Sequence, residues 1–258
     1  PIRTEEGRRV RRAFIAPAGH RLLSVDYSQV ELRILAHYSQ DAALLAAFRE
    51  GQDIHRATAA AVYHVPLEDV TYEQRSFAKS VNFGLMYGMG AYRLARESNL
   101  TLAEAEAFIA GYFQQFPGVR RYLDASLQRA RELGYVETLL GRRRYFPILH
   151  EKGPVQASFQ ARQRAEREAI NMPIQGTAAD IIKIAMINLA HALKDGGYQA
   201  KLILQVHDEL VLEVPDDEID TVAPLTVEIM ESAFTLDAPL VADARVGTNW
   251  AEMTPYGR

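Results

Sequence analysis

Strand-like segments lie at both ends of this chain, and helical periodicity fills the space between them. An apolar run at residues 21–27 has strand length, and further strand-like runs cover residues 201–206, 210–214 and 241–246. Between them, apolar residues recur at spacings of three and four, which is typical of helices. This order favours an α+β fold, in which a sheet built from both chain ends carries a helical insertion, over a regular βαβ repeat.

The helical patterns divide into separate segments, with a short hairpin around Gly141 and an irregular loop at 150–160. The predicted helices are one over residues 29–48, an alanine-rich helix with Asp53 as N-cap, a stretch at 72–97 broken around Gly84, Gly88 and Gly90, one from Thr101 (with a capping box to Glu104) to Phe116, one over 119–133, a long one over 162–193 interrupted near Pro173 and Gly176, and one from 215–217 to about Ala233.

Composition excludes several classes of protein. Hydrophobic residues make up 48% and charged residues 24% of the 258 residues, as in a globular protein with a buried core. No apolar run approaches the roughly 20 residues needed to span a bilayer, and no leader opens the chain, so we expect a cytoplasmic protein without membrane contact. The absence of cysteine excludes disulfides and thiolate metal sites.

The net charge of −4 argues against a protein that coats polyanions generally. Arginines nevertheless cluster at residues 3–12, 142–144 and 162–167. Such clusters can hold phosphates, but a charge run is usually only a solvated face, which is the favoured interpretation of each cluster taken alone.

Two aspartates stand where strands end. Asp26 comes near the end of the first apolar run, and Asp208 lies at the tip of the predicted hairpin of residues 201–214. If these strands pair, the two carboxylates would repel each other unless a divalent cation held them, and such a cation can assist phosphoryl transfer. From spacing alone the alternative stays open that Asp26 caps the next helix and Asp208 is a turn residue.

One helical face combines cations with aromatic rings. Arg75, Lys79, Phe83 and Tyr87 follow one another at intervals of four and therefore share a face. A triphosphate needs cations, and a base needs a flat surface on which to stack. The face therefore predicts a nucleotide site, although the two aromatic residues could instead belong to the core.

Three segments together resemble the family A DNA polymerases of bacteria. Residues 25–33 (VDYSQVELR) resemble motif A, residues 75–88 (RxxxKxxxFGxxYG) resemble motif B or the O helix, and residues 205–209 (QVHDE) match motif C. The resemblance runs from residue 2 to about residue 252. It implies an antiparallel-sheet palm at residues 1–32 and 161–258, and a mainly helical fingers insertion at 33–160 with the O helix at 74–88. The thumb and exonuclease-type domains of the family would lie outside this chain.

The resemblance also implies roles for individual residues. Asp26 and Asp208 would hold two Mg²⁺ ions (Mn²⁺ is the alternative) with the backbone carbonyl of Tyr27, and Lys79 would also protonate the departing pyrophosphate. Glu31 would exclude a 2′-hydroxyl, and Tyr87 would occupy the place of the templating base before closure. The remaining implied contacts are Arg75, Lys79, Phe83, Tyr87, His55, Gln29 and Glu31 for the nucleotide, Arg3, Asn171, Gln175 and His207 for primer–template DNA, and Glu209 as a carboxylate near the metals that does not bind them directly.

The implied function is template-directed DNA synthesis from dNTPs on a primer, by a two-metal-ion mechanism. Apart from a missing thumb and N-terminal palm segment, we expect no protein partner, so that the protein is monomeric. It would be associated with the bacterial nucleoid. The alternative is a nucleotide- and metal-binding fragment that is inactive until a missing thumb and N-terminal palm segment are supplied. An unrelated metal phosphohydrolase is a third possibility, but it would not need the face formed by Arg75, Lys79, Phe83 and Tyr87.

Overall fold

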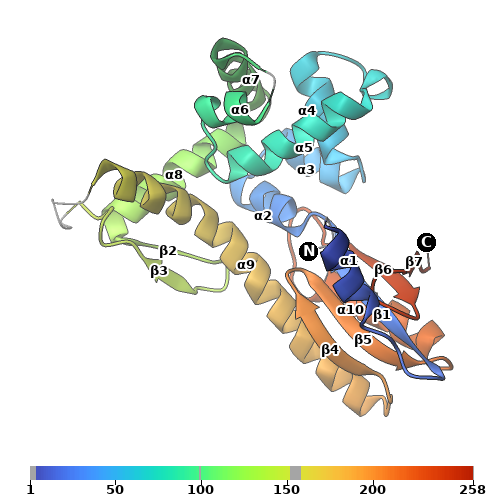
Figure 1. The fold of residues 1–258 in the computed structure, drawn as a ribbon. Coiled ribbons are helices and arrows are strands. Elements are labelled where there is room, and N and C mark those ends of the chain that lie inside the picture. Colours follow the sequence, from blue (N-terminus) through green and yellow to red (C-terminus); the bar gives the residue numbers. More distant parts are fainter. Residues whose placement is uncertain (1–3, 99, 152–157, 258) are drawn as a thin grey trace. The chain divides into compact units, whose positions relative to one another are not determined.

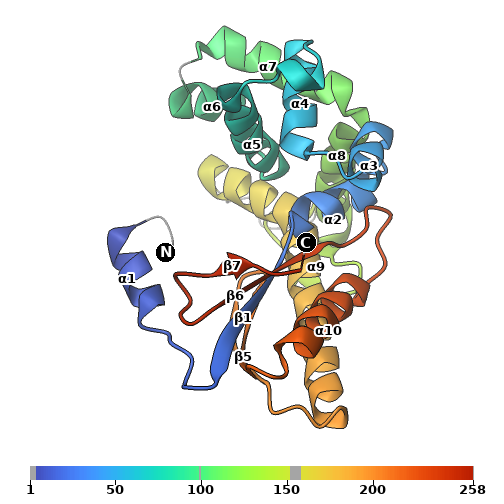
Figure 2. The same cartoon turned by 90° about the vertical axis from the view of Figure 1, so that its right-hand side faces the viewer.

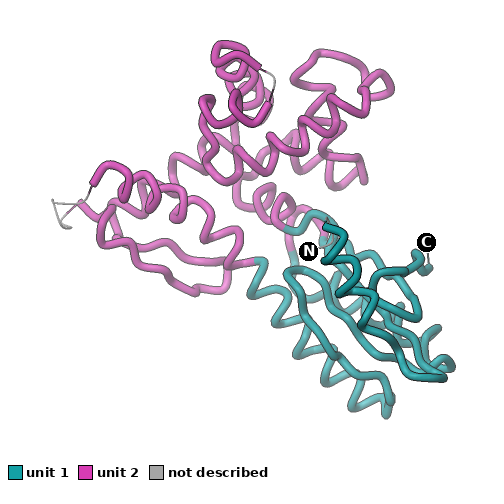
Figure 3. Tube along the Cα trace, viewed as in Figure 1, with its two compact units in different colours: residues 1–30, 178–235, 240–258 teal, residues 31–177, 236–239 magenta. Residues whose placement is uncertain are grey.

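The computed structural model describes residues 4–98, 100–151 and 158–257. Helices and antiparallel strands make up the chain, which confirms the α+β prediction (Figure 1). The chain forms two compact units (Figure 3): unit 1 comprises residues 1–30, 178–235 and 240–258, and unit 2 comprises residues 31–177 and 236–239. None of the described helices has both the length and the apolar character needed to cross a membrane.

Unit 1 is built on a five-stranded antiparallel sheet in the order β4-β5-β1-β6-β7. Its strands are β1 (His20–Tyr27), β4 (Lys201–Val206), β5 (Glu209–Pro215), β6 (Ala242–Gly247) and β7 (Thr254–Pro255). The sheet thus combines segments from both ends of the chain, as the sequence predicted.

The two faces of this sheet differ. Helix α10 (Ile219–Ser232) packs along one face (Figure 2), where the Tyr27 hydroxyl donates to the carbonyl of Met230 at 2.6 Å. Because side chains alternate along a strand, Ser24 and Asp26 of β1 point to the opposite face, away from α10. Unit 1 also contains α1 (Glu5–Arg12), which the sequence analysis did not predict as a helix.

Unit 2 is mainly helical. Its N-cap predictions are confirmed: Asp53 accepts hydrogen bonds from two backbone amides at the start of α4, and Thr101 and Glu104 form a capping box on α7. The elements are α2 (Val30–Ser39), α3 (Ala42–Arg49), α4 (Ile54–Tyr63), the 3₁₀ turn η1 (Leu67–Asp69), α5 (Tyr72–Met86), α6 (Ala91–Glu97), α7 (Leu102–Gln115), α8 (Pro117–Leu133), the hairpin strands β2 (Tyr135–Glu137) and β3 (Arg143–Tyr145), and α9 (Phe159–Asp195), which continues into unit 1.

Two helix predictions were wrong in their boundaries. The segment 29–48 is two helices, because Gln40 takes a φ of 48° and Asp41 then caps α3. Helix α9 was expected to break near Pro173, yet it runs unbroken from Phe159 to Asp195. Burial of Met172 and Ile174 on either side of the proline stabilises the helix despite the backbone hydrogen bond that proline cannot make.

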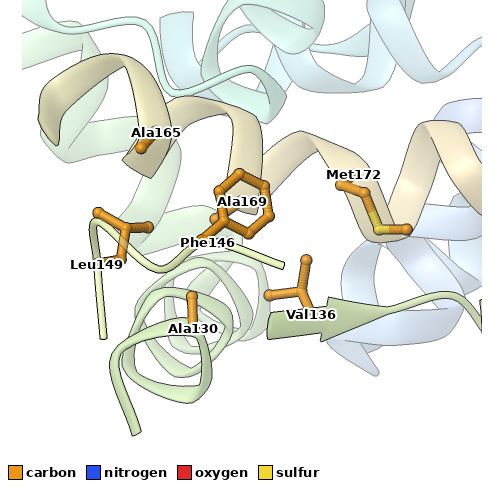
Figure 4. Packing of buried hydrophobic residues seen from close by; sticks show 7 residues of the cluster. All are labelled: Ala130, Val136, Phe146, Leu149, Ala165, Ala169 and Met172. Carbon is orange, nitrogen blue, oxygen red and sulfur yellow. The ribbon is translucent and has the colours of Figure 1, made fainter. Parts of the chain in front are cut away.

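Of the breaks predicted around Gly84, Gly88 and Gly90, the first is wrong, and the other two glycines lie between α5 and α6. Gly84 lies within the helix, and the chain turns at Gly88, whose φ is 71°. A separate apolar cluster joins α8, the β2–β3 hairpin and the first half of α9 (Figure 4), and it fixes the arginine-bearing hairpin to unit 2. Its buried members are Ala130, Val136, Phe146, Leu149, Ala165, Ala169 and Met172.

Candidate active site

The strands of unit 1 bring Asp26 and Asp208 together. Strand β1 pairs antiparallel with β5, with Asp26 opposite Glu209, and the backbone amide of Tyr27 donates to the carbonyl of Asp208 at 3.2 Å. The two aspartate carboxyl groups share a hydrogen bond. Burial raises the pKa of both groups, and the negative charge of Asp208 raises the pKa of Asp26 further. Two carboxyl groups in this contact require either a shared proton or a cation.

The chemistry of this pair fits a hard divalent cation. Mg²⁺ is usually bound through one or two carboxylates, with phosphate oxygens and water completing its octahedron. Within the described part of the chain, no group of three or more His, Asp or Glu side chains is arranged to hold a metal. A cation held only by Asp26 and Asp208 would keep ligand positions open for other groups.

Other charged groups line the same face of the sheet. Asp243 of β6 lies opposite Asp26, and Arg245 lies opposite Ser24, so that negative and positive side chains flank the pair. The positive charge of Arg245 lowers the pKa of Asp26, against the larger effects of burial and of Asp208. Sequence reasoning missed both residues, although their i, i+2 spacing in a predicted strand was a usable signal.

Glu209 is held by three donors. Its Oε1 accepts hydrogen bonds from Ser24 Oγ at 2.6 Å and from Trp250 Nε1 at 2.7 Å. Its Oε2 faces the Arg11 guanidinium at 3.5 Å, and the glutamate side chain is 14% exposed. These three partners were not predicted from the sequence.

Helix α5 in unit 2 carries the predicted cationic and aromatic face. A capping box at Thr71 and Gln74 begins the helix, and Tyr87 ends it. Arg75 Nε donates to Asp53 Oδ2 at 2.5 Å, while Asp53 Oδ1 caps α4. Lys79, one turn further along, is exposed and forms no ion pair within the described ranges. Asp53 was predicted only as a cap, so its ion pair with Arg75 is a finding of the structure.

His55 lies beneath this face. It is 3% exposed, its ring centroid is 5.8 Å from that of Phe83, and its Nδ1 is 3.1 Å from Asn82 Nδ2. Burial lowers the pKa of His55 to about 4, and the nearby positive charges of Lys79 and Arg75 add to this effect. His55 is therefore neutral at pH 7, and it accepts the amide hydrogen of Asn82.

At the far end of α5, the Tyr87 hydroxyl donates a hydrogen bond to the Glu31 carboxylate, within unit 2. Both side chains are half-buried, as is Phe83. Gln29, in the turn before α2, has a φ of 57°. The bond links two of the residues that the sequence assigned to the nucleotide.

The residues expected to contact DNA have different environments. Gln175 is exposed on α9, and the Oδ1 atom of Asn171 is buried without a hydrogen-bond partner in the described part of the chain. His207 is exposed in the turn before Asp208, with a φ of 56° and its carbonyl accepting from Gln205 Nε2 at 2.5 Å. Arg3 lies outside the described residues.

Comparison with known proteins gives consistent matches. A sequence model described as DNA polymerase family A matches residues 1–252. DNA polymerase I of Pseudomonas aeruginosa is 53% identical over 252 residues, which are 98% of this chain and 27% of that protein. The thermostable DNA polymerase I of Thermus aquaticus is 48% identical over 250 residues, which are 97% of this chain and 29% of that protein.

Among solved structures, the POL domain of Pol1 from M. smegmatis, in complex with DNA primer-template and dNTP, matches with a TM-score of 0.91 and 46% identity. The match covers 97% of this chain and 44% of that one. The chain spans less than a third of the length of the two curated relatives, since 27% and 29% of them are covered.

Proposed function

The chain belongs to DNA polymerase family A, and from this membership we propose that it contributes the catalytic carboxylates and the nucleotide-binding helix of template-directed DNA synthesis. The reaction joins a deoxynucleotide from a dNTP to a primer 3′-hydroxyl and releases pyrophosphate. The observation that carries the proposal is the contact between Asp26 and Asp208, which come from distant parts of the chain and meet where β1 ends and β5 begins.

Asp26 and Asp208 are proposed to hold the divalent metal ions that family A polymerases use, with the Tyr27 carbonyl as a further ligand. When bound, two such ions stabilise the attacking and the leaving oxygen of a phosphoryl transfer. The closeness of the two carboxylates supports this role, because their mutual repulsion favours cation binding. Mg²⁺ is the proposed ion, with Mn²⁺ as a substitute.

The face of α5 is proposed to bind the incoming dNTP. Arg75 and Lys79 would contact the triphosphate, and Phe83 would stack on the base. Arg75 already forms an ion pair with Asp53. The triphosphate would therefore compete with the Asp53 carboxylate for the Arg75 guanidinium. Lys79 is also the proposed donor of a proton to the pyrophosphate, for which its exposure is suitable.

Sugar and template recognition are assigned to the other end of the helix. Glu31 is proposed to exclude a 2′-hydroxyl, and its hydrogen bond with Tyr87 supports a fixed carboxylate position. Tyr87 is proposed to hold the place of the templating base, and the turn at Gly88 offers a hinge for its release. His55 and Gln29 are assigned to the nucleotide, and Glu209 to the surroundings of the metal ions.

Primer–template DNA is the proposed partner, with contacts from Arg3, Asn171, Gln175 and His207. The unpartnered Oδ1 of Asn171 supports this assignment, since a buried acceptor without a donor is costly unless a ligand satisfies it. The palm at residues 1–32 and 161–258 and the fingers at 33–160 remain the proposed domain division, and the nucleoid the proposed location.

Primer extension tests the proposal. The chain is assayed alone and joined to the remainder of the polymerase region found in its relatives, with Mg²⁺ and dNTPs. Extension that is lost in both Asp26→Asn and Asp208→Asn supports the carboxylate assignment. Extension that survives either substitution contradicts it.

A second candidate follows from the length of the relatives, because this chain spans only 27% of the P. aeruginosa protein. On that hypothesis the chain binds nucleotide and metal but does not turn over alone. Nucleotide binding without extension by the chain, followed by extension in the joined protein, would favour this candidate. Extension by the chain alone would exclude it.

A further inference from the structure

Glu209 differs from the two aspartates beside it in having its own set of donors. Asp26 and Asp208 share a hydrogen bond with each other, whereas Glu209 accepts from the Ser24 hydroxyl and the Trp250 indole and faces the Arg11 guanidinium. We call these donors, Ser24, Trp250 and Arg11, the Glu209 network. A carboxylate with three donors gains little by leaving them.

The network is itself anchored. The backbone amide of Trp250 donates to the carbonyl of Phe14 at 3.0 Å, and the two rings meet edge to face at 5.5 Å. The Arg11 guanidinium lies over the indole, 4.0 Å from its centroid. Trp250 therefore stands between the α1 segment and the sheet, with its Nε1–H directed at Glu209 Oε1.

Backbone geometry nevertheless puts Glu209 within reach of the aspartate pair. It follows Asp208 directly in the chain and lies opposite Asp26 in the β1–β5 ladder. Directly opposed residues in antiparallel strands have Cα atoms about 4.5–5.5 Å apart, and a glutamate side chain can span that distance. The Glu209 carboxylate is thus directed toward its three donors by their hydrogen bonds and charge, and not by its place in the backbone.

We propose that Trp250 and Ser24 are positioning residues that withhold Glu209 from the cation site, so that the site keeps two carboxylates instead of three. The inference rests on the proposed function in one respect, namely that Asp26 and Asp208 bind divalent cations. A third carboxylate would raise cation affinity, because affinity follows the number of charged ligands. It would also take a coordination position that substrate phosphate needs, and so would slow turnover.

The substitution Trp250→Phe tests the proposal because it removes the Nε1–H and keeps an aromatic ring against Phe14 and Arg11. Mn²⁺ binding is measured on the purified protein by electron paramagnetic resonance, without DNA or nucleotide. We expect severalfold tighter binding in Trp250→Phe and in Ser24→Ala, and a return to the parent affinity or weaker when Glu209→Gln is added to either. Tyr256→Phe, which removes a hydroxyl bonded to the Asp220 carboxylate elsewhere in unit 1, is the matched control and should leave binding unchanged.

Turnover gives the second readout. In the joined protein, Trp250→Phe should lower kcat/KM for dNTP about tenfold, because Glu209 would compete with substrate phosphate for the ion. Glu209→Gln in the Trp250→Phe background should restore part of the loss, which a purely structural defect would not allow. Circular dichroism melts establish that each variant is folded, since Trp250 is the chain's single tryptophan and its fluorescence is lost with it.

Unchanged or weaker Mn²⁺ binding in both folded single variants would overturn the proposal, as would tighter binding that persists when Glu209→Gln is added. Failure of the proposed function has a different signature. In that case the parent chain binds no Mn²⁺, or Asp26→Asn leaves binding intact, whatever the state of Trp250.

Discussion

The sheet end of unit 1 and the α5 face of unit 2 hold their functional side chains in different ways. At the sheet end, paired strands fix Asp26 opposite Glu209, and Glu209 is held in turn by three donors. On α5, Lys79 is exposed and Arg75 is held by a single carboxylate, that of Asp53. One region is built from fixed partners, and the other from side chains that can exchange partners.

Under the proposed function, the difference corresponds to two chemical tasks. Charge that must stabilise a transition state is most effective when its groups are already oriented, because no reorganisation is then needed during the reaction. A nucleotide that must enter and leave is better met by groups that can change partners. The turn at Gly88 after α5 adds a point at which that helix can move, whereas the ladder of β1 and β5 offers none.

The largest expected effect comes from substituting either aspartate at the sheet end of unit 1. Asp26→Asn or Asp208→Asn should lower kcat for primer extension by about 10³-fold, since several kcal/mol of metal-assisted stabilisation are lost. The free energy of unfolding, measured by urea titration in EDTA, should be unchanged or higher, because one of two repelling carboxylates has been removed. A lower stability with preserved activity would show that the pair is structural.

The sequence predicted the sheet end better than the rest of the chain. An aspartate at the end of an apolar strand is conspicuous, and both Asp26 and Asp208 are where the strand pattern placed them. The partners of Glu209 were not predictable, because Arg11 and Trp250 meet it only through tertiary contacts far from it in the sequence. Helix α1 was missed for a related reason: its single large apolar residue, Val10, gives no periodicity.

The α5 face was predictable as a pattern but not in its pairing. Intervals of four placed Arg75 and Lys79 on one face, and the helix bears this out. The ion pair of Arg75 with Asp53 depends on how α4 packs against α5, which spacing does not determine. Likewise, helix propensity predicted a break at Pro173. The helix is continuous there, because burial of the residues on either side of the proline stabilises it.

Substitutions of Lys79 test the α5 face, whose side chains can exchange partners. Lys79→Ala should lower kcat/KM for dNTP by about 10²-fold and change the free energy of unfolding by less than about 0.5 kcal/mol, since the side chain is exposed. Lys79→Arg is the matched control: it keeps the charge but cannot release a proton, so KM should stay near the parent value while kcat falls. Equal losses in dNTP use and duplex binding would contradict the role given to Lys79.

His55, which lies beneath the α5 face, should make the free energy of unfolding depend on pH. Its pKa in the folded state is about 4, mainly because of burial, against about 6.5 when unfolded. The unfolded chain therefore binds more protons between these values, so the stabilisation is complete above pH 6.5 and is lost as pH falls towards 4. Urea titrations at pH 7 and pH 4.5 should differ by on the order of 2 kcal/mol more in the parent than in His55→Gln. An equal pH dependence in the two proteins would contradict this.

The smallest expected effect separates the ion pair of Asp53 from its cap. Asp53→Asn keeps an acceptor for the amides of α4 but removes the charge that holds Arg75. Because both side chains are about a third exposed (33% and 34%), we expect a loss of only about 0.5 kcal/mol in urea titration. Asp53→Ala should cost about 1 kcal/mol more, through the lost cap. If the two regions differ as described, Asp53→Asn also tightens dNTP binding, because the triphosphate no longer competes with a carboxylate for Arg75. Weaker dNTP binding would mean that Asp53 orients Arg75, and that the α5 face is as firmly held as the sheet end.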